Sequence, residues 1–160
     1  MPCLGHPAYQ PDRSADYATA LQRRADELGV QLPADDTGSD HPGPDGFNCH
    51  GVHLEPTTIR LGDRFDTSAE ARIAPLPCGC YLFGYTCNVS YAGSSCGVSL
   101  FGQTYDTEAD ALEAALDRIA LTLDSHRNAE YASTRSAAAR LADLVDAARP
   151  SAAHQLALFA

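Results

Sequence analysis

The sequence contains no lysine and no tryptophan, so each of its 11 basic residues is an arginine. Acidic residues number 21, which leaves a formal net charge of −10 at pH 7. A surface of this sign repels phosphate groups. We therefore expect no direct binding to DNA or RNA.

Long apolar runs are also missing. No stretch approaches the about 20 consecutive apolar residues of a transmembrane helix. The segment from Met1 to His6 has neither the basic start nor the apolar run of a secretory signal. We therefore predict no membrane association and a cytoplasmic location, where the six cysteines would be reduced thiols and not a disulfide scaffold.

Hydrophobic residues make up 44% of the chain, enough to build a folded core. The pattern predicts an α+β fold, in which an N-terminal helix precedes an antiparallel sheet of four to five strands covered on one face by helices. We divide the chain into an N-terminal helical segment at 1–32, a flexible loop at 33–46, an α+β domain at 47–149 and a C-terminal docking tail at 150–160.

Apolar residues recur at helical spacing from Ser14 to Leu28. Ser14 is a suitable N-cap, and Gly29 is suited to end the helix. The loop that follows is dominated by proline, glycine and aspartate. We therefore expect the helix to be only loosely docked.

Strand patterns extend from Phe47 to Tyr105. Residues 52–54 and 59–61 predict a hairpin. From 81 to 91 the odd positions are almost all bulky, which is typical of a strand with one buried face. Residues 92–95 would then form a turn that pairs Tyr91 with Cys96 and places Cys96 on the same apolar face.

Asp106–Asp110 predicts the start of a helix, with Thr107 and Asp110 near the spacing of a capping box. The chain has no proline or glycine from there to Pro150, and we expect a break near Ser125–Asn128 between two helices. The second helix would turn the following residues inward: Tyr131, Ala138, Leu141, Leu144 and Val145.

Residues 65–71 are similar to residues 105–111, which suggests a duplicated strand-to-helix junction. The stretch 81–119 combines an aromatic hairpin, a Tyr-Asp-Thr junction and an Ala/Leu-rich helix. This pattern resembles small α+β domains in proteins of plasmids and other mobile elements.

Cysteine and histidine form the best candidate for a metal site. Cys49, His53, Cys78 and Cys80 would supply the sulfur and nitrogen ligands of a structural zinc ion. The spacing is poor, because Cys-x-Cys chelates less well than Cys-x-x-Cys. The alternative is that these thiols simply fill the core or loops, since cysteine is among the most buried residue types.

The chain ends in the apolar sequence Gln-Leu-Ala-Leu-Phe-Ala, which Pro150 separates from the helical pattern. These letters resemble the pentapeptide by which many bacterial replication and repair proteins bind the DNA polymerase sliding clamp. The resemblance implies that Gln155 is a polar anchor and that Leu156, Leu158 and Phe159 fill apolar pockets. The alternative is a segment that folds back onto its own domain.

From this resemblance we expect a non-enzymatic accessory protein of bacterial or mobile-element DNA metabolism, recruited to the clamp by its tail. One alternative is an acidic anti-defence protein, such as an anti-CRISPR or anti-restriction inhibitor, that imitates DNA and blocks a nucleic-acid-binding enzyme. Another is a small zinc-binding module.

Overall fold

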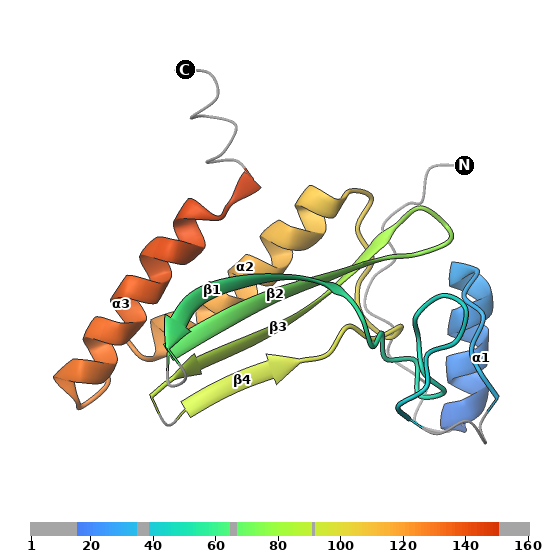
Figure 1. The fold of residues 1–160 in the computed structure, drawn as a ribbon, viewed down its shortest axis with the longest axis horizontal. Coiled ribbons are helices and arrows are strands. Elements are labelled where there is room, and N and C mark those ends of the chain that lie inside the picture. Colours follow the sequence, from blue (N-terminus) through green and yellow to red (C-terminus); the bar gives the residue numbers. More distant parts are fainter. Residues whose placement is uncertain (1–15, 35–38, 65–66, 91, 151–160) are drawn as a thin grey trace, which may run out of the picture. The chain divides into compact units, whose positions relative to one another are not determined.

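The computed structural model describes residues 16–34, 39–64, 67–90 and 92–150 (Figure 1). Four strands form one sheet in the order β1-β2-β3-β4, and three helices accompany it. The elements are α1 (Tyr17–Leu28), β1 (Thr57–Arg64), β2 (Thr67–Pro75), β3 (Tyr81–Val89), β4 (Ala92–Cys96), α2 (Glu108–Ser125) and α3 (Ala132–Ala147). The sheet is antiparallel, so the predicted α+β class is confirmed.

The chain forms two compact units. The first comprises the described residues of Met1–Thr57 together with Ile73–Phe83 and Gly97–Ala111. The second comprises the described residues of Thr58–Arg72, Gly84–Cys96 and Leu112–Ala160.

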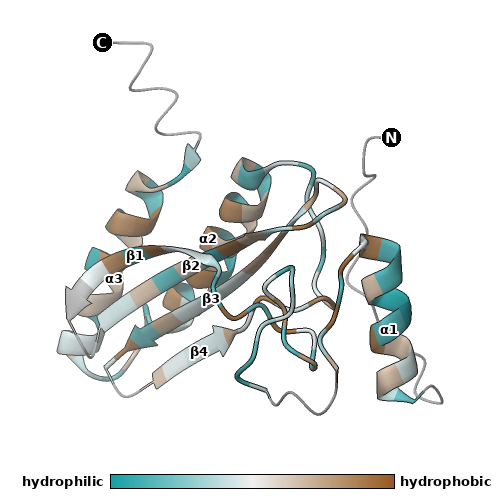
Figure 2. Cartoon of the chain, turned by 45° about the vertical axis from the view of Figure 1, so that its right-hand side comes forward, coloured by the Kyte–Doolittle hydropathy of each residue, from teal (hydrophilic) through white to brown (hydrophobic). Residues whose placement is uncertain are grey.

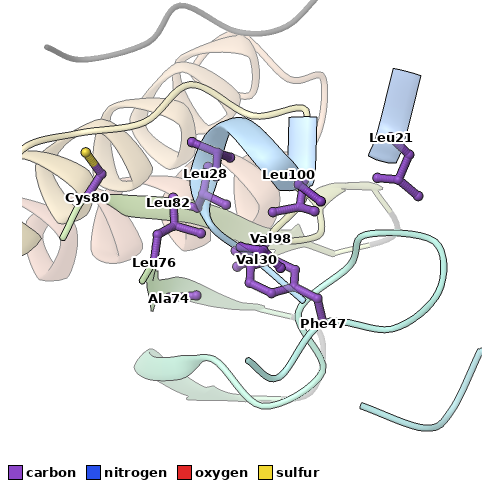
Figure 3. Close-up of a cluster of buried hydrophobic side chains, with 11 residues drawn as sticks. Leu21, Leu28, Val30, Phe47, Ala74, Leu76, Cys80, Leu82, Val98 and Leu100 are labelled. Atoms are coloured by element: carbon purple, nitrogen blue, oxygen red, sulfur yellow. The ribbon is translucent and has the colours of Figure 1, made fainter. Parts of the chain in front are cut away.

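The core of the first unit joins α1 to segments that are distant in sequence (Figure 3). Leu21, Ala25 and Leu28 come from α1, and they are buried together with residues of the loops and of the ends of β2 and β3. Those partners are Val30, Phe47, Ala74, Leu76, Cys80, Leu82, Val98 and Leu100. The helix is therefore a full part of this core, and the expected loose docking is wrong.

The ends of α1 follow local signals only in part. Gly29 closes the helix in the left-handed conformation with φ +71°, as predicted. The helix begins at Tyr17 with Asp16 as its N-cap, and Asp16 makes no capping hydrogen bond through its side chain. The predicted cap, Ser14, lies outside the described residues.

The predicted hairpin of residues 52–54 and 59–61 does not form. Val52 instead bridges to Ser99, and His53 bridges to Phe47. These contacts hold the loop within the first unit, whereas β1 pairs with β2. The short apolar runs were correctly identified as extended, but their partners were wrong.

The suggested strand-to-helix duplication at 65–71 is also wrong, because Thr67–Pro75 is strand β2. Ala69, Ala71 and Ile73 are buried in alternation along it, which is the period of a strand and not of a helix.

Strand β3 changes its buried side along its length. Leu82 and Gly84 are buried in its first half, and Cys87 and Val89 in its second half. Because side chains alternate between the faces of a strand, an even-to-odd change means that the buried face switches. The prediction that all odd positions share one buried face is therefore right only for the second half.

The hairpin between β3 and β4 has a different register from the one predicted. Val89 pairs with Ala92, and Tyr85 pairs with Cys96, so the connection is two residues long. Ser90 permits this tight turn by adopting φ +56°, a left-handed conformation that is rare for residues other than glycine. Cys96 is exposed, and not on an apolar face as expected.

In the second unit, α2 and α3 cover one face of the strands (Figure 1). Thr107 caps α2, since its hydroxyl oxygen accepts the backbone N–H of Asp110 at 3.1 Å. Both helices carry hydrophobic as well as hydrophilic residues along their length (Figure 2). The residues that α2 buries are Ala111, Ala115, Leu116, Ile119 and Leu123.

The predicted break between the two C-terminal helices is confirmed, because α2 ends at Ser125 and α3 begins at Ala132. The inward face of α3 was predicted with two errors. Tyr131 is the N-cap and is 69% exposed, and Leu144 is 45% exposed. The buried residues of α3 are Ala137, Ala138, Leu141 and Val145.

Among the residues that the structure describes, no helix combines the length and apolar character needed to cross a membrane.

Candidate functional site

The four residues predicted to contact a partner, Gln155, Leu156, Leu158 and Phe159, lie outside the described residues. The structure does describe the chain that leads to them. Helix α3 ends at Ala147, and the described chain continues to Pro150.

Arg149 fixes the end of α3 to α2 within the second unit. Its Nη1 donates to a carboxylate oxygen of Glu113 and to Oδ1 of Asp117, the latter at 2.8 Å. Its Nε donates to Oδ1 of Asp146 at 3.4 Å. Burial acts to lower the pKa of Arg149, but the hydrogen bonds with Asp117 and Glu113 outweigh it and raise the pKa above its ordinary value.

The ion pairs of this cluster reduce the net negative charge on the surface of α2 and α3. Three carboxylates, those of Glu113, Asp117 and Asp146, share one guanidinium. A second arginine, Arg127, pairs with Asp124 at 2.7 Å. The acidic face of α2 and α3 is therefore partly neutralised by its own arginines.

The predicted zinc ligands Cys49, His53, Cys78 and Cys80 all belong to the first unit. Cys80 is fully buried in the hydrophobic cluster, Cys49 is 8% exposed, and Cys78 is partly buried against the cluster. Within the described ranges, no three His, Cys, Asp or Glu side chains come together in a way that could hold a metal ion. The structure therefore does not bring these residues together as a ligand set.

His53 occupies a distinctive position among these residues. Its ring packs edge-on against Phe47, with centroids 4.8 Å apart. Its Nδ1 is buried and has no hydrogen-bond partner among the described residues. Burial lowers the pKa of His53, and the nearby carboxylate of Glu55 opposes that shift. The neutral imidazole is therefore the form that this position favours.

A cavity of about 350 Å³ lies beside α1 in the first unit. The Tyr17 hydroxyl donates to the carbonyl oxygen of His50 at 3.1 Å, and its ring lies 5.5 Å from that of Phe101. Cys49 and Gln22 contribute a thiol and an amide to the wall. These groups offer hydrogen-bonding and apolar surface and no concentrated charge.

The cysteines of the sheet are in contrasting environments. Cys87 is fully buried, and burial raises the pKa of its thiol to about 11. Cys96, which we expected on the same apolar face, is exposed on β4. A thiol with the pKa of Cys87 stays protonated near neutral pH and has little nucleophilic character.

Two features of the second unit have no counterpart in the predictions from sequence. One is the cluster around Arg149, whose partners Glu113 and Asp117 lie 36 and 32 residues away in the chain. The other is a groove of about 480 Å³ beside α3, with arginines and aspartates among its lining residues. The spacing of alanines on α3 was the signal available for the groove, but it also fits a buried helix face.

No protein-family model, curated protein or solved structure matches the chain. The functional argument therefore depends on this sequence and its own geometry.

Proposed function

We propose that the chain is a non-enzymatic accessory protein of bacterial or mobile-element DNA metabolism that acts in the cytoplasm and is recruited to the DNA sliding clamp. The observation that carries this proposal is the segment Gln155–Phe159, whose letters resemble the clamp-binding pentapeptide. Gln155 is the polar anchor, and Leu156, Leu158 and Phe159 occupy the apolar pockets.

The geometry of the second unit supports this assignment. Arg149 holds the end of α3 against α2 immediately before Pro150, so the peptide follows a firmly attached helix. The five residue-to-residue steps from Pro150 to Gln155 span at most about 18 Å. This length separates the peptide from the helix without tethering it far from the folded protein.

The energetics are consistent with a reversible partner. Burying two leucine side chains and one phenylalanine contributes roughly 5–8 kcal/mol before the cost of ordering the peptide. A dissociation constant on the order of micromolar follows from that balance.

The test is binding of the full chain to a purified bacterial sliding clamp, measured by titration calorimetry. We expect Leu158→Ala/Phe159→Ala to weaken binding at least about 30-fold. Ala157→Ser is the matched control, since serine is a commoner residue at this position of the pentapeptide, and it should bind as well as wild type or more tightly. Equal binding by the wild type and the double variant would remove the proposal.

An acidic inhibitor of a nucleic-acid-binding enzyme is the second candidate, and the net charge of −10 favours it. The arginine pairs described above reduce the negative charge that α2 and α3 present, so we rank it below clamp recruitment. It requires binding to a DNA-handling enzyme that weakens steeply with added salt. Binding that is independent of salt would contradict it.

A further inference from the structure

The groove beside α3 belongs entirely to the second unit and is independent of the tail. Leu123 and Arg127 contribute from the end of α2 and the turn after it, and the remaining lining residues lie on α3. Its volume of about 480 Å³ exceeds what a single side chain fills. Several side chains of a neighbouring surface can therefore enter it.

Charges in the groove are separated by sign along α3. Arg135 lies in the first turn of the helix, whereas Asp143 and Asp146 lie in its last turns. Eleven residues of helix separate Arg135 from Asp146, or about 16 Å. Arg127 lies in the turn before α3 and adds a second positive charge to the lining.

The middle of the groove is small and uncharged. Ala139 and Ala142 share a helix face with Arg135 and Asp146, because the four positions follow one another at intervals of four, three and four residues. Tyr131, one turn before Arg135 on this face, is 69% exposed and extends it with apolar surface. Alanines at such positions allow a second helix to approach the backbone closely.

We propose that this groove is the interface of a homodimer, in which α3 packs antiparallel against α3 of a second copy about a two-fold axis near Ala139–Ala142. The antiparallel orientation places Arg135 beside Asp143 of the partner subunit and Asp146 of the partner subunit, and symmetry repeats both pairs. A parallel orientation would place like charges together.

Charge also identifies the occupant as a second copy. The groove contains two arginines and two aspartates, so it is neutral on a chain whose formal net charge is −10. Two copies that meet at this surface therefore bring no net charge of the groove lining together. When α3 of one copy runs antiparallel to α3 of the other, the arginine end of each helix meets the aspartate end of its partner. An interface that uses the same patch on both subunits requires this self-complementarity.

The first test is the mass of the full chain in solution, measured by sedimentation equilibrium from about 5 to 300 µM, a range that covers weak dimers. We expect the mass to rise from the 17.0 kDa of one chain toward twice that value. A mass of one chain across the whole range would overturn the proposal.

The second test exchanges the charges of the groove. Arg135→Glu and Asp143→Arg should each weaken the dimer at least about 10-fold, because each places like charges opposite one another. The double variant restores opposite charges between positions 135 and 143 and should dimerise more tightly than either single variant, although the carboxylate at position 135 then faces Asp146 of the partner subunit. Asp143 is chosen over Asp146 because Asp146 also accepts a hydrogen bond from Arg149.

Arg140→Glu controls for the change of charge, since Arg140 is exposed on α3 and does not line the groove, whereas Arg135 also donates hydrogen bonds to the carbonyl oxygens of Ala129 and Glu130. It should dimerise as wild type does. A double variant that stays monomeric while its thermal unfolding is unchanged would contradict the antiparallel pairing. As a variant without a change of charge, Ala139→Gln should abolish dimerisation, whereas Ala147→Gln, exposed on the same helix outside the groove, should not.

Discussion

The Nε of Arg24 donates a hydrogen bond of 3.0 Å to the backbone carbonyl oxygen of Leu100, 76 residues away in the chain. Arg24 is 2% exposed, and its Nη2 also reaches the carbonyl oxygen of Gly102 at 3.4 Å. Glu27 balances the charge from the next turn of α1, at 3.2 Å. A buried arginine therefore fastens α1 to the segment around Leu100 within the first unit.

Arg24→Met should destabilise the protein by about 2 to 4 kcal/mol, because methionine fills much of the volume but leaves one buried and one partly buried carbonyl group without their donor. Chemical denaturation measures this loss. Arg23→Met is the matched control, since Arg23 is the exposed neighbour on the same helix, and it should change stability by less than about 0.5 kcal/mol. Equal effects of the two substitutions would show that the bonds of Arg24 contribute nothing.

Gly46→Ala should be more harmful than Gly79→Ala, although both glycines adopt positive φ, +82° and +89°. The conformation alone costs roughly 1 to 2 kcal/mol for alanine. A Cβ at Gly46 would lie 2.6 Å from Nε2 of His53, whereas one at Gly79 would meet nothing within 4 Å. We expect the Gly46 variant to lose at least about 1 kcal/mol more in denaturant unfolding.

If the two alanine variants unfold at the same denaturant concentration, the ring of His53 is not held against Phe47 firmly enough to resist the added methyl group.

His53 should make stability fall as the solution becomes acidic. Its pKa in the folded protein is lowered by burial, so the folded state binds its proton less readily than the unfolded state, whose value is near 6.5. The contribution of His53 is therefore fully present above about pH 6.5 and is lost as the pH falls through the lowered native pKa. Unfolding free energies measured from pH 7.5 to pH 5 test this expectation.

His53→Gln should reduce that acid sensitivity, whereas His50→Gln, at an exposed position, should leave it as in wild type. The comparison between variants cancels the other groups that titrate in the same range. An identical pH dependence for wild type and His53→Gln would refute the assignment.

Arg149→Gln should loosen the end of α3. Loss of the bonds to Glu113 and Asp117 leaves two carboxylates near each other without their cation, and we expect a cost of about 1 to 2 kcal/mol at low salt. Amide hydrogen exchange should accelerate at residues 144–148. Arg140→Gln, on the exposed side of α3, should leave that exchange unchanged, and about 1 M salt should narrow the difference between the variants.

Local signals in the sequence predicted the local features correctly. Gly29 ends α1, Thr107 caps α2, and the polar stretch near Ser125 separates α2 from α3. Each of these features depends on residues within one or two helical turns. The fold class followed because the periodicities of the helices and of β3 were strong enough to assign their types.

Pairing between distant segments was not predictable in the same way. The hairpin register depends on Ser90 adopting a left-handed conformation, for which serine gives no sequence signal. Because the buried face switches along β3, the bulky residues at the odd positions of its first half are only half buried. The alternation of bulky and small residues alone therefore predicts the wrong buried face there. The sequence does not predict the burial of Arg24, because charged residues usually lie at the surface. Its hydrogen bond to the carbonyl oxygen of Leu100 becomes known only from the folded structure.

The candidate functional residues differ in the same way in how far the sequence predicts them. The proposed docking peptide can be identified in the sequence because the motif that it resembles consists of five consecutive residues. The groove on α3 and the cluster of Arg149 become visible only after folding, since both combine α3 with residues of α2 or of the turn that follows it.

Strand β4 lies at the edge of the sheet and consists of the small, uncharged residues Ala-Gly-Ser-Ser-Cys. Proteins usually protect such an edge with lysine, proline or an inward-pointing charge, and β4 contains none of them. The net charge of −10 makes whole molecules repel one another, and that repulsion vanishes near the isoelectric point of about 4.8. Acidification should accordingly promote strand-to-strand aggregation that begins at this edge, and a single lysine introduced at Ser95 should delay it.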